Sequence, residues 1–274
     1  MKIQIIILST LILLLCSCRK ELEYPPQDET GHVTFMVESI SRNSQEGDFQ
    51  DGDAIGIFAI EPITGVYWAT NNKYVYDGNK FKPATEEDDI VVTKGTDFDF
   101  YVYYPYDPNQ NDITNISHVC IDQDTKSGWV SSDFMTATYT DAIIDYSIPL
   151  QFKHNYATVE VHVNKNDGVT AATLKNVKYS SRINLLTGQS ITEDSRINLK
   201  MYCYNANDNG NAIFRCTVPV QTLSALSNYV TLSGNTSIDL LAESDMTLSA
   251  GKIPKIHSDN RLSIWRYNDW CWLL

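Results

Sequence analysis

The feature that most constrains this fold is a period-two alternation of apolar and polar side chains, which recurs along most of the chain. Successive side chains of a β-strand point to opposite faces, so this alternation is typical of half-buried strands. It is clear at residues 33–37, 98–104 and 159–163. A helical period is nearly absent, and only residues 220–229 suggest a short helix or turn. With 16 tyrosines and many Asn-Gly and Asp-Gly turns, the pattern predicts an all-β, antiparallel, two-layer protein.

The first alternating segment also predicts which side chains are buried. Val33, Phe35 and Val37 should point into a core, and the intervening side chains should face outward or into an edge contact. The outward set is His32, Thr34, Met36 and Glu38.

Residues 1–17 differ from the rest of the chain and are typical of a signal peptide. The apolar run from Ile3 to Leu15 is too short to cross a bilayer as a helix, which takes about twenty residues. The sequence Leu15-Cys16-Ser17-Cys18 is similar to a bacterial lipobox. We therefore predict that residues 1–17 are a lipoprotein signal peptide and that Cys18 is lipidated. An ordinary signal with incidental cysteines is the alternative.

The mature chain divides into three predicted parts. Residues 18–31 contain two prolines, several charges and little to bury, so we expect a flexible tether. A loop-like segment then ends near Pro149, before a fresh strand pair. We predict an N-terminal β-sandwich domain at 32–148 and a C-terminal one at 149–274, each near the usual size of about 100 residues.

Charge and motif content exclude some functions. The formal net charge of -13 would repel nucleic acid over most of the surface. The five histidines show no metal-binding or catalytic spacing. His154 is the best single candidate for a ligand or base, although a strand histidine bonded to backbone explains it better. Acidic clusters at 86–89 and 48–53 lack the alternating ligand spacing of a calcium loop. We predict no catalytic residue, no metal and no cofactor.

The cysteines offer one candidate bridge. Once Cys16 leaves with the signal, none of the cysteines beyond Cys18 has the CxxC spacing of a zinc or redox site. The pair Asn209-Gly210 is a strong hairpin signal, and a two-residue turn there pairs residues whose numbers sum to 419. Cys203 and Cys216 satisfy that sum, so we expect them to face one another, either as a disulfide or as two thiols.

Four segments carry a resemblance to a known family. They are DFQDGDAIGIFA at 48–59, FYVYYPY at 100–106, SDFMTA at 132–137 and LQFKHNYA at 150–157. In this order, behind a lipobox, they resemble signatures of the fimbrillin-like lipoproteins of the Bacteroides group. The resemblance covers residues 18–255 and implies two transthyretin-like antiparallel β-sandwich domains in tandem.

The resemblance also implies a function. It is that of a non-enzymatic cell-surface lipoprotein, either a fimbrial (pilus) subunit or a pilus-associated adhesin of a type V pilus at the outer membrane. In such pili a trypsin-like protease cuts after Arg or Lys, and the first strand leaves a groove that a strand of another subunit fills. Here Val33, Phe35 and Val37 mark the candidate exchanged strand, and Arg42 is the candidate processing site. A solvated loop arginine without a role is the alternative.

Two other functions stay open. A surface lipoprotein could bind glycans through aromatic side chains such as Tyr67, Trp68 and Trp129. An enzyme would need a pocket with convergent titratable groups, and the sequence offers none. The last residues, SDNRLSIWRYNDWCWLL at 258–274, depart from the regular alternation that the family implies. This departure questions whether the chain donates a C-terminal strand of its own.

Overall fold

A computed structural model gives the fold. It describes residues 29–40, 49–143, 145–164, 168–204, 211–235, 237–258 and 264–267. The predicted signal peptide (1–17), the lipidation site Cys18, the processing site Arg42 and the turn Asn209-Gly210 lie outside the described residues. The described part is built from β-strands with one short helix, α2 (Lys126–Ser131), which confirms the all-β prediction.

Seven strands of the N-terminal half close into a barrel in the order β10-β2-β5-β4-β3-β7-β9. We call this part the barrel lobe. Strand β2 pairs in parallel with β10, whereas the other pairs around the ring are antiparallel. The strands are β2 (Thr34–Ile40), β3 (Ala54–Ile60), β4 (Tyr67–Tyr76), β5 (Phe81–Pro83), β7 (Asp99–Tyr104), β9 (Met135–Tyr139) and β10 (Ser147–His154). A separate pair, β1 (Thr30–His32) and β6 (Val91–Thr93), flanks the ring.

The barrel core is filled by alternate side chains of its strands. Phe35 from β2 makes edge contacts with Tyr74 of β4 and Phe100 of β7, with ring centroids 5.1 and 5.3 Å apart. Phe100, Val102 and Tyr104 alternate along β7 as buried inward residues. The period-two reading of residues 98–104 is therefore confirmed.

The C-terminal half forms a nine-stranded sheet, counted over the described residues, in the order β15-β12-β19-β20-β23-β22-β11-β17-β16. We call it the C-terminal lobe. The sheet curls, because β12 contacts β16 and β17 from the opposite end of the order. Its strands are β11 (Tyr156–Asn164), β12 (Val169–Lys178), β15 (Arg196–Lys200), β16 (Tyr202–Tyr204), β17 (Asn211–Pro219), β19 (Tyr229–Gly234), β20 (Ser237–Ala242), β22 (Lys255–Ser258) and β23 (Ile264–Tyr267). A small pair, β18 (Thr222–Leu223) and β21 (Met246–Thr247), accompanies it.

Part of the unusual C-terminal tail is an ordinary strand. The backbone of β23 pairs in parallel with β20 and antiparallel with β22. The flanking residues 259–263 and 268–274 lie outside the described residues.

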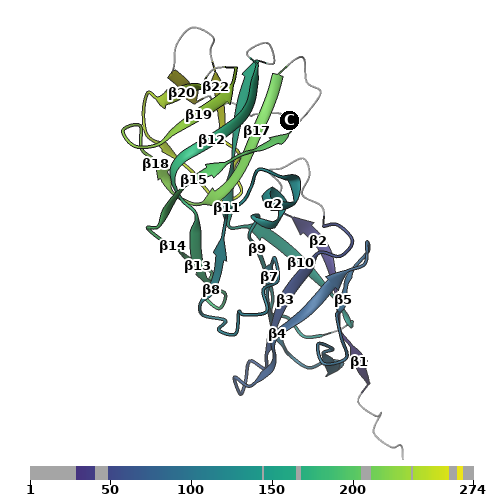
Figure 1. The fold of residues 1–274 in the computed structure, drawn as a ribbon. Helices are drawn as coiled ribbons and strands as arrows, with labels where there is room; N and C mark the ends of the chain where they lie inside the picture. The colour runs from purple at the N-terminus through teal and green to yellow at the C-terminus, as the bar shows by residue number, and fades with distance from the viewer. Residues whose placement is uncertain are drawn as a thin grey trace, which may run out of the picture.

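A third sheet joins the two lobes. It has the order β14-β13-β8, so β8 (Ile116–Val119) from the N-terminal half pairs with β13 (Ser180–Asn184) from the C-terminal half. On its other side β13 pairs with β14 (Gln189–Thr192). Figure 1 shows these strands lying between the barrel lobe and the larger sheet. A buried cluster lies here and combines Phe58 and Tyr103 of the barrel with Tyr156 and Ile183. We call it the junction core.

Several boundaries differ from the sequence-based expectation. Strand β10 belongs to the barrel, so the sheet changes after His154 and not after Ile148. Thr30 and Gly31, which we assigned to the tether, pair with β6. The N-terminal strands close into a ring, whereas we expected a sandwich of separate sheets. Residues 225–227 form a turn, which is one of the two structures that the sequence suggested for 220–229. The helix α2 was not expected, and Thr125 caps its first turn by accepting a hydrogen bond from the Gly128 amide.

Candidate functional site

The candidate exchanged strand, β2, is built into the wall of the barrel. On one side it pairs with β10, from Thr34 opposite Ser147 to Ile40 opposite Phe152, with an irregularity between Leu150 and Gln151. On the other side Phe35 is paired with Phe81 of β5. The β10 contact also includes polar side chains, since Gln151 Nε2 donates to Glu38 Oε2 at 2.9 Å. Removing β2 would therefore open the ring on both sides.

The inward side chains of this segment are those that the alternation predicts. Val33 and Phe35 are fully buried in the barrel core, and Val37 is half-buried against it. His32, Met36 and Glu38 are exposed, and Thr34 is half-buried. The chain does not form one continuous strand, however, because Val33 separates β1 from β2 and its amide donates to the Ile90 carbonyl at 2.8 Å.

An open cavity of about 520 Å³ lies at the C-terminal end of β2. Val37 and Ile40 line it from β2, and Tyr76 and Gly78 line it from the β4–β5 hairpin. Phe49 closes another side and packs edge-on against Phe81 and Phe152, at 4.9 Å from each ring. The end of the candidate strand therefore lies beside open space and is not enclosed by the core.

The two acidic clusters serve local structure. Asp53 Oδ2 accepts a hydrogen bond from the Gln50 amide at 2.8 Å, which caps the turn before β3. Asp88 accepts from the Lys73 amide at 2.7 Å and from Thr85 Oγ1 at 3.0 Å. Across the described ranges, no group of three or more His, Cys, Asp or Glu side chains is arranged to hold a metal ion.

The predicted cysteine pair is wrong. Cys203 lies opposite Phe214, so paired numbers on β16 and β17 sum to 203 + 214 = 417 and not 419. Cys216 of β17 is a free thiol that is buried in the core of the C-terminal lobe, and it lies opposite Val159 of β11. The Asn-Gly signal therefore predicted the wrong register for β16 and β17, because a dipeptide cue alone cannot fix the pairing of the strands that flank it.

His154 contacts a carboxylate and not backbone alone. Its Nδ1 lies 2.8 Å from Asp133 Oδ1, and its side chain is 7% exposed. Burial alone would lower the pKa of His154, but the hydrogen bond and charge of Asp133 outweigh burial and raise it. Leu150 and Phe152, which precede His154 on β10 by four and two positions, are buried in the barrel core.

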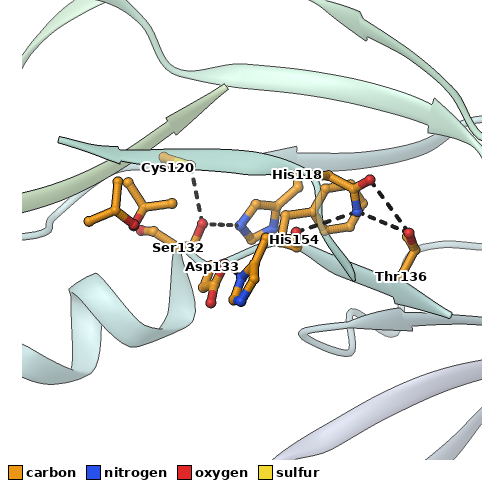
Figure 2. Close-up of polar contacts among 10 residues, drawn as sticks. His118, Cys120, Ser132, Asp133, Thr136 and His154 are labelled. Atoms are coloured by element: carbon orange, nitrogen blue, oxygen red, sulfur yellow. Dashed lines mark hydrogen bonds and ion pairs between the residues drawn. The ribbon is translucent and has the colours of Figure 1, made fainter. Parts of the chain in front are cut away.

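Around Asp133 lies a compact polar cluster, shown in Figure 2. The Ser132 carbonyl accepts from Cys120 Sγ at 3.4 Å and lies 3.2 Å from His118 Nε2. Burial raises the pKa of the Cys120 thiol well above its ordinary value, so the nucleophilic thiolate is disfavoured. The His118 ring stacks on Phe134, with centroids 5.0 Å apart. These contacts fix the chain that follows α2 and give no nucleophile with an adjacent base.

A buried ion pair on the outer face of the C-terminal sheet escaped the sequence analysis. Arg215 of β17 reaches Glu160 of β11 at 2.7 Å, and both side chains are about 5% exposed or less. His162 Nε2 lies 2.9 Å from the other Glu160 oxygen. Burial would raise the pKa of Glu160, but His162 and Arg215 outweigh it and lower that pKa. The Arg215 guanidinium also lies 3.8 Å from the centre of the Tyr204 ring.

The segment around α2 covers this face. The buried side chain of Gln123 donates to the Thr217 carbonyl and accepts from the Thr217 amide, both at 2.7 Å. The Gln123 side chain therefore takes the place of a neighbouring strand along β17, beyond the residues that pair with β16. Trp129 of α2 is buried and stacks on Tyr202 at 5.9 Å. No local pattern could reveal these contacts, because Gln123 and Thr217 are 94 residues apart.

Of the aromatic residues considered for glycan binding, Tyr67 and Trp68 are exposed, whereas Trp129 is not. Trp68 packs edge-on against Phe98 with centroids 5.6 Å apart, and its Nε1 donates to the Val91 carbonyl at 3.2 Å. In the part of the chain that the structure describes, no helix reaches the length and apolar character that crossing a bilayer requires.

Comparison with known families gives a match over most of the chain. The profile described as fimbrillin-like covers residues 41–257. The chain belongs to the fimbrillin-like family. Membership of this family indicates a structural role at the cell surface or in a fimbria, in company with other fimbrial subunits. The comparison with curated proteins gave no match.

Solved structures show the same fold as this fimbrillin-like chain. A candidate cell adhesion protein from Bacteroides ovatus is 14% identical with a TM-score of 0.67, and the match covers 88% of this chain and 96% of that one. A second, from Bacteroides uniformis, is 16% identical with a TM-score of 0.64, covering 90% and 100%. A fimbrial protein from Bacteroides ovatus is 17% identical with a TM-score of 0.52, covering 84% of this chain and 49% of that one.

Proposed function

We propose that this fimbrillin-like protein is a lipid-anchored pilus subunit, or a pilus-associated adhesin, that assembles by exchange of its first strand. The observation that carries the proposal is the position of β2. It is a short wall strand between β10 and β5, it buries Phe35 in the barrel core, and its far end adjoins an open cavity. A strand of another subunit with the same alternation could recover both its backbone bonds and its burial.

The energetics favour exchange over spontaneous loss of the strand. Burial of an aliphatic or aromatic side chain contributes about 1.5–3 kcal/mol, and Val33 and Phe35 are both fully buried. Release of β1 and β2 therefore needs a cut in the following segment and a replacement strand. Arg42 is the proposed processing site, and Cys18 is the proposed anchor to the outer membrane. We also propose that the two lobes are tandem transthyretin-like domains.

Mass spectrometry of protein recovered from cells tests the proposal. We expect an acylated Cys18 in the precursor, a new N-terminus at Asn43 in the assembled form, and ladders of subunits on unboiled gels. Arg42→Ala should abolish both the new N-terminus and the ladders. Lys252→Ala, at an exposed basic residue of the C-terminal lobe, is the matched control and should change neither. Ladders that persist in the Arg42→Ala variant would show that assembly does not depend on this cut.

Glycan binding is the second candidate function. Its support is the exposure of Tyr67 and Trp68 on β4. The indole of Trp68 already contacts Phe98 and Val91, which reduces the surface available for stacking on a sugar ring. We therefore rank this function below assembly.

A further inference from the structure

Apolar side chains gather in solvent at the tip of the β3–β4 hairpin. Ile63, Val66, Tyr67 and Trp68 are 85%, 54%, 48% and 57% exposed. We call these four residues the tip patch. Exposed apolar residues that occur singly need no explanation, but four within six positions form a local patch.

The hairpin holds the patch in a defined shape. The Gly65 amide donates to the Glu61 carbonyl at 2.8 Å, and the Glu61 amide donates to the Val66 carbonyl at 3.0 Å. Gly65 has φ +69°, a left-handed conformation that glycine adopts at no steric cost. Trp68 is fixed against Phe98 and the Val91 carbonyl. The hairpin backbone therefore presents the tip patch as a surface of defined shape.

The tip patch lies at the end of the barrel where the chain enters the fold. The Val91 carbonyl that binds Trp68 belongs to the residue paired with His32 of β1. Figure 1 shows the β3–β4 hairpin and β1 at the same end of the barrel lobe, away from the nine-stranded sheet. Cys18 precedes Glu29 by 29 − 18 = 11 residues, which span at most about 40 Å when extended. An anchor at Cys18 therefore keeps this end of the protein close to the bilayer.

We infer that the tip patch is a second contact with the lipid surface, beside the acyl anchor. This inference rests on the anchoring in the proposed function. Trp and Tyr favour the membrane interface, and short aliphatic side chains add burial among the outer parts of the acyl chains. Glu61 lies in the hairpin, Asp89 contacts His32 of β1, and the whole chain carries a net charge of -13. We therefore expect the tip patch to contact zwitterionic headgroups, because anionic lipids would repel this negatively charged protein.

Vesicle flotation tests this contact without the anchor. The probe is the mature chain with Cys18→Ala, mixed with phosphatidylcholine and phosphatidylethanolamine vesicles. We expect weak but measurable partitioning, which Ile63→Ser with Val66→Ser should lower about tenfold. The matched control is Leu226→Ser, since Leu226 is 97% exposed in a turn of the C-terminal lobe. It should float like the parent chain, and all variants should share one denaturation midpoint.

Three results would overturn the inference. They are no flotation of the parent chain, equal flotation of the double variant, and a concentration-dependent dimer that the double variant abolishes. Retention on a glycan surface through the same residues, without vesicle binding, would assign the patch to sugars instead. Failure of the anchor itself would appear separately, as native protein without acyl groups, because the vesicle assay uses an unlipidated chain.

Discussion

At the scale of single residues, the polar interactions that matter most are those with little access to water. Glu160 and Arg215 are nearly inaccessible, and Arg215 is further enclosed by Tyr204 and Trp129. A buried pair of this kind adds little net stability over an apolar pair, but loss of one partner leaves a buried charge uncompensated. The pair Lys178–Asp194 has the same N–O distance, 2.7 Å, but Asp194 is 95% exposed, so water screens the pair.

Glu160→Gln should destabilise the protein by about 3–5 kcal/mol, because Arg215 would keep its charge without a counter-charge. Urea denaturation followed by circular dichroism measures the change. Asp194→Asn, at the exposed pair, is the control and should leave the midpoint unchanged. A midpoint for Glu160→Gln equal to the parent value would mean that water already reaches Arg215.

The lowered pKa of His118 predicts that the protein loses stability in mild acid. Burial lowers its pKa to about 4, although the Ser132 carbonyl and the charges of Asp133 and Asp107 oppose this shift. Because the folded pKa is below the unfolded value of 6.5, the contribution is fully present above pH 6.5. As the pH falls towards 4 this contribution is lost, and the free energy of unfolding should decrease by about 1–3 kcal/mol, a range that allows for the partial exposure of His118. His154, whose pKa is raised, acts in the opposite direction.

The His118→Phe variant keeps an aromatic ring against Phe134 and removes the titration. Its free energy of unfolding should fall less steeply than that of the parent between pH 6.5 and 4. The measurement is a series of urea titrations across that range. Parallel curves for the two proteins would exclude His118 as the source.

At the scale of secondary-structure elements, β2 matters most, because it completes the barrel ring. Its two neighbours are contributed by distant parts of the chain, and its own core contacts come mainly from Phe35, with Val33 just before it. Its opposite face is exposed, as Met36 illustrates. The two faces of this strand should therefore respond very differently to truncation.

Phe35→Ala should destabilise the protein by about 3–5 kcal/mol, since it removes a buried ring that contacts Tyr74 and Phe100. Met36→Ala, one position along, should change stability by less than about 0.5 kcal/mol. Guanidinium denaturation provides both values. Similar losses for the two variants would contradict the inward direction of Phe35.

How far the sequence predicts these features depends on whether the cause is local. Alternation in residues 33–37 and 98–104 is a property of adjacent residues, and it correctly predicts strands and their buried faces. The parallel pairing of β2 with β10 depends on residues more than a hundred positions away, so no local pattern predicts ring closure. The register of Cys203 failed for a related reason, because it depends on the length of the intervening loop. Asp133 as the partner of His154 and Gln123 on β17 were likewise outside the reach of local patterns.

At the scale of the whole molecule, the junction core makes the two lobes one body. Phe58 and Tyr103 on the outer face of the barrel share this core with Tyr156 and Ile183. The Tyr156 hydroxyl also donates to the His118 carbonyl at 3.1 Å. Strands from both halves are paired in the same small sheet. A shared apolar core and a shared sheet oppose independent motion of the two lobes.

We therefore expect a single cooperative unfolding transition. Hydrogen exchange with mass spectrometry in rising urea should show peptides from β3 and β7 opening at the same concentration as peptides from β12 and β19. Ile183→Ser, within the junction core, should separate the two sets. Separate openings in the parent chain would show that the lobes are energetically independent.

The parallel contact between β2 and β10 also sets an order of events during folding. The bond from Thr34 Oγ1 to the Tyr146 carbonyl joins residues 112 positions apart, and loop closure over such a distance makes folding slow. The first strand is synthesised early but has no β10 partner until residues near 152 have followed. Strand β2 is therefore among the last strands to be incorporated into the wall of the barrel as the new chain folds. Because β2 is incorporated late, it can also be removed without first breaking the strand pairs that form before it.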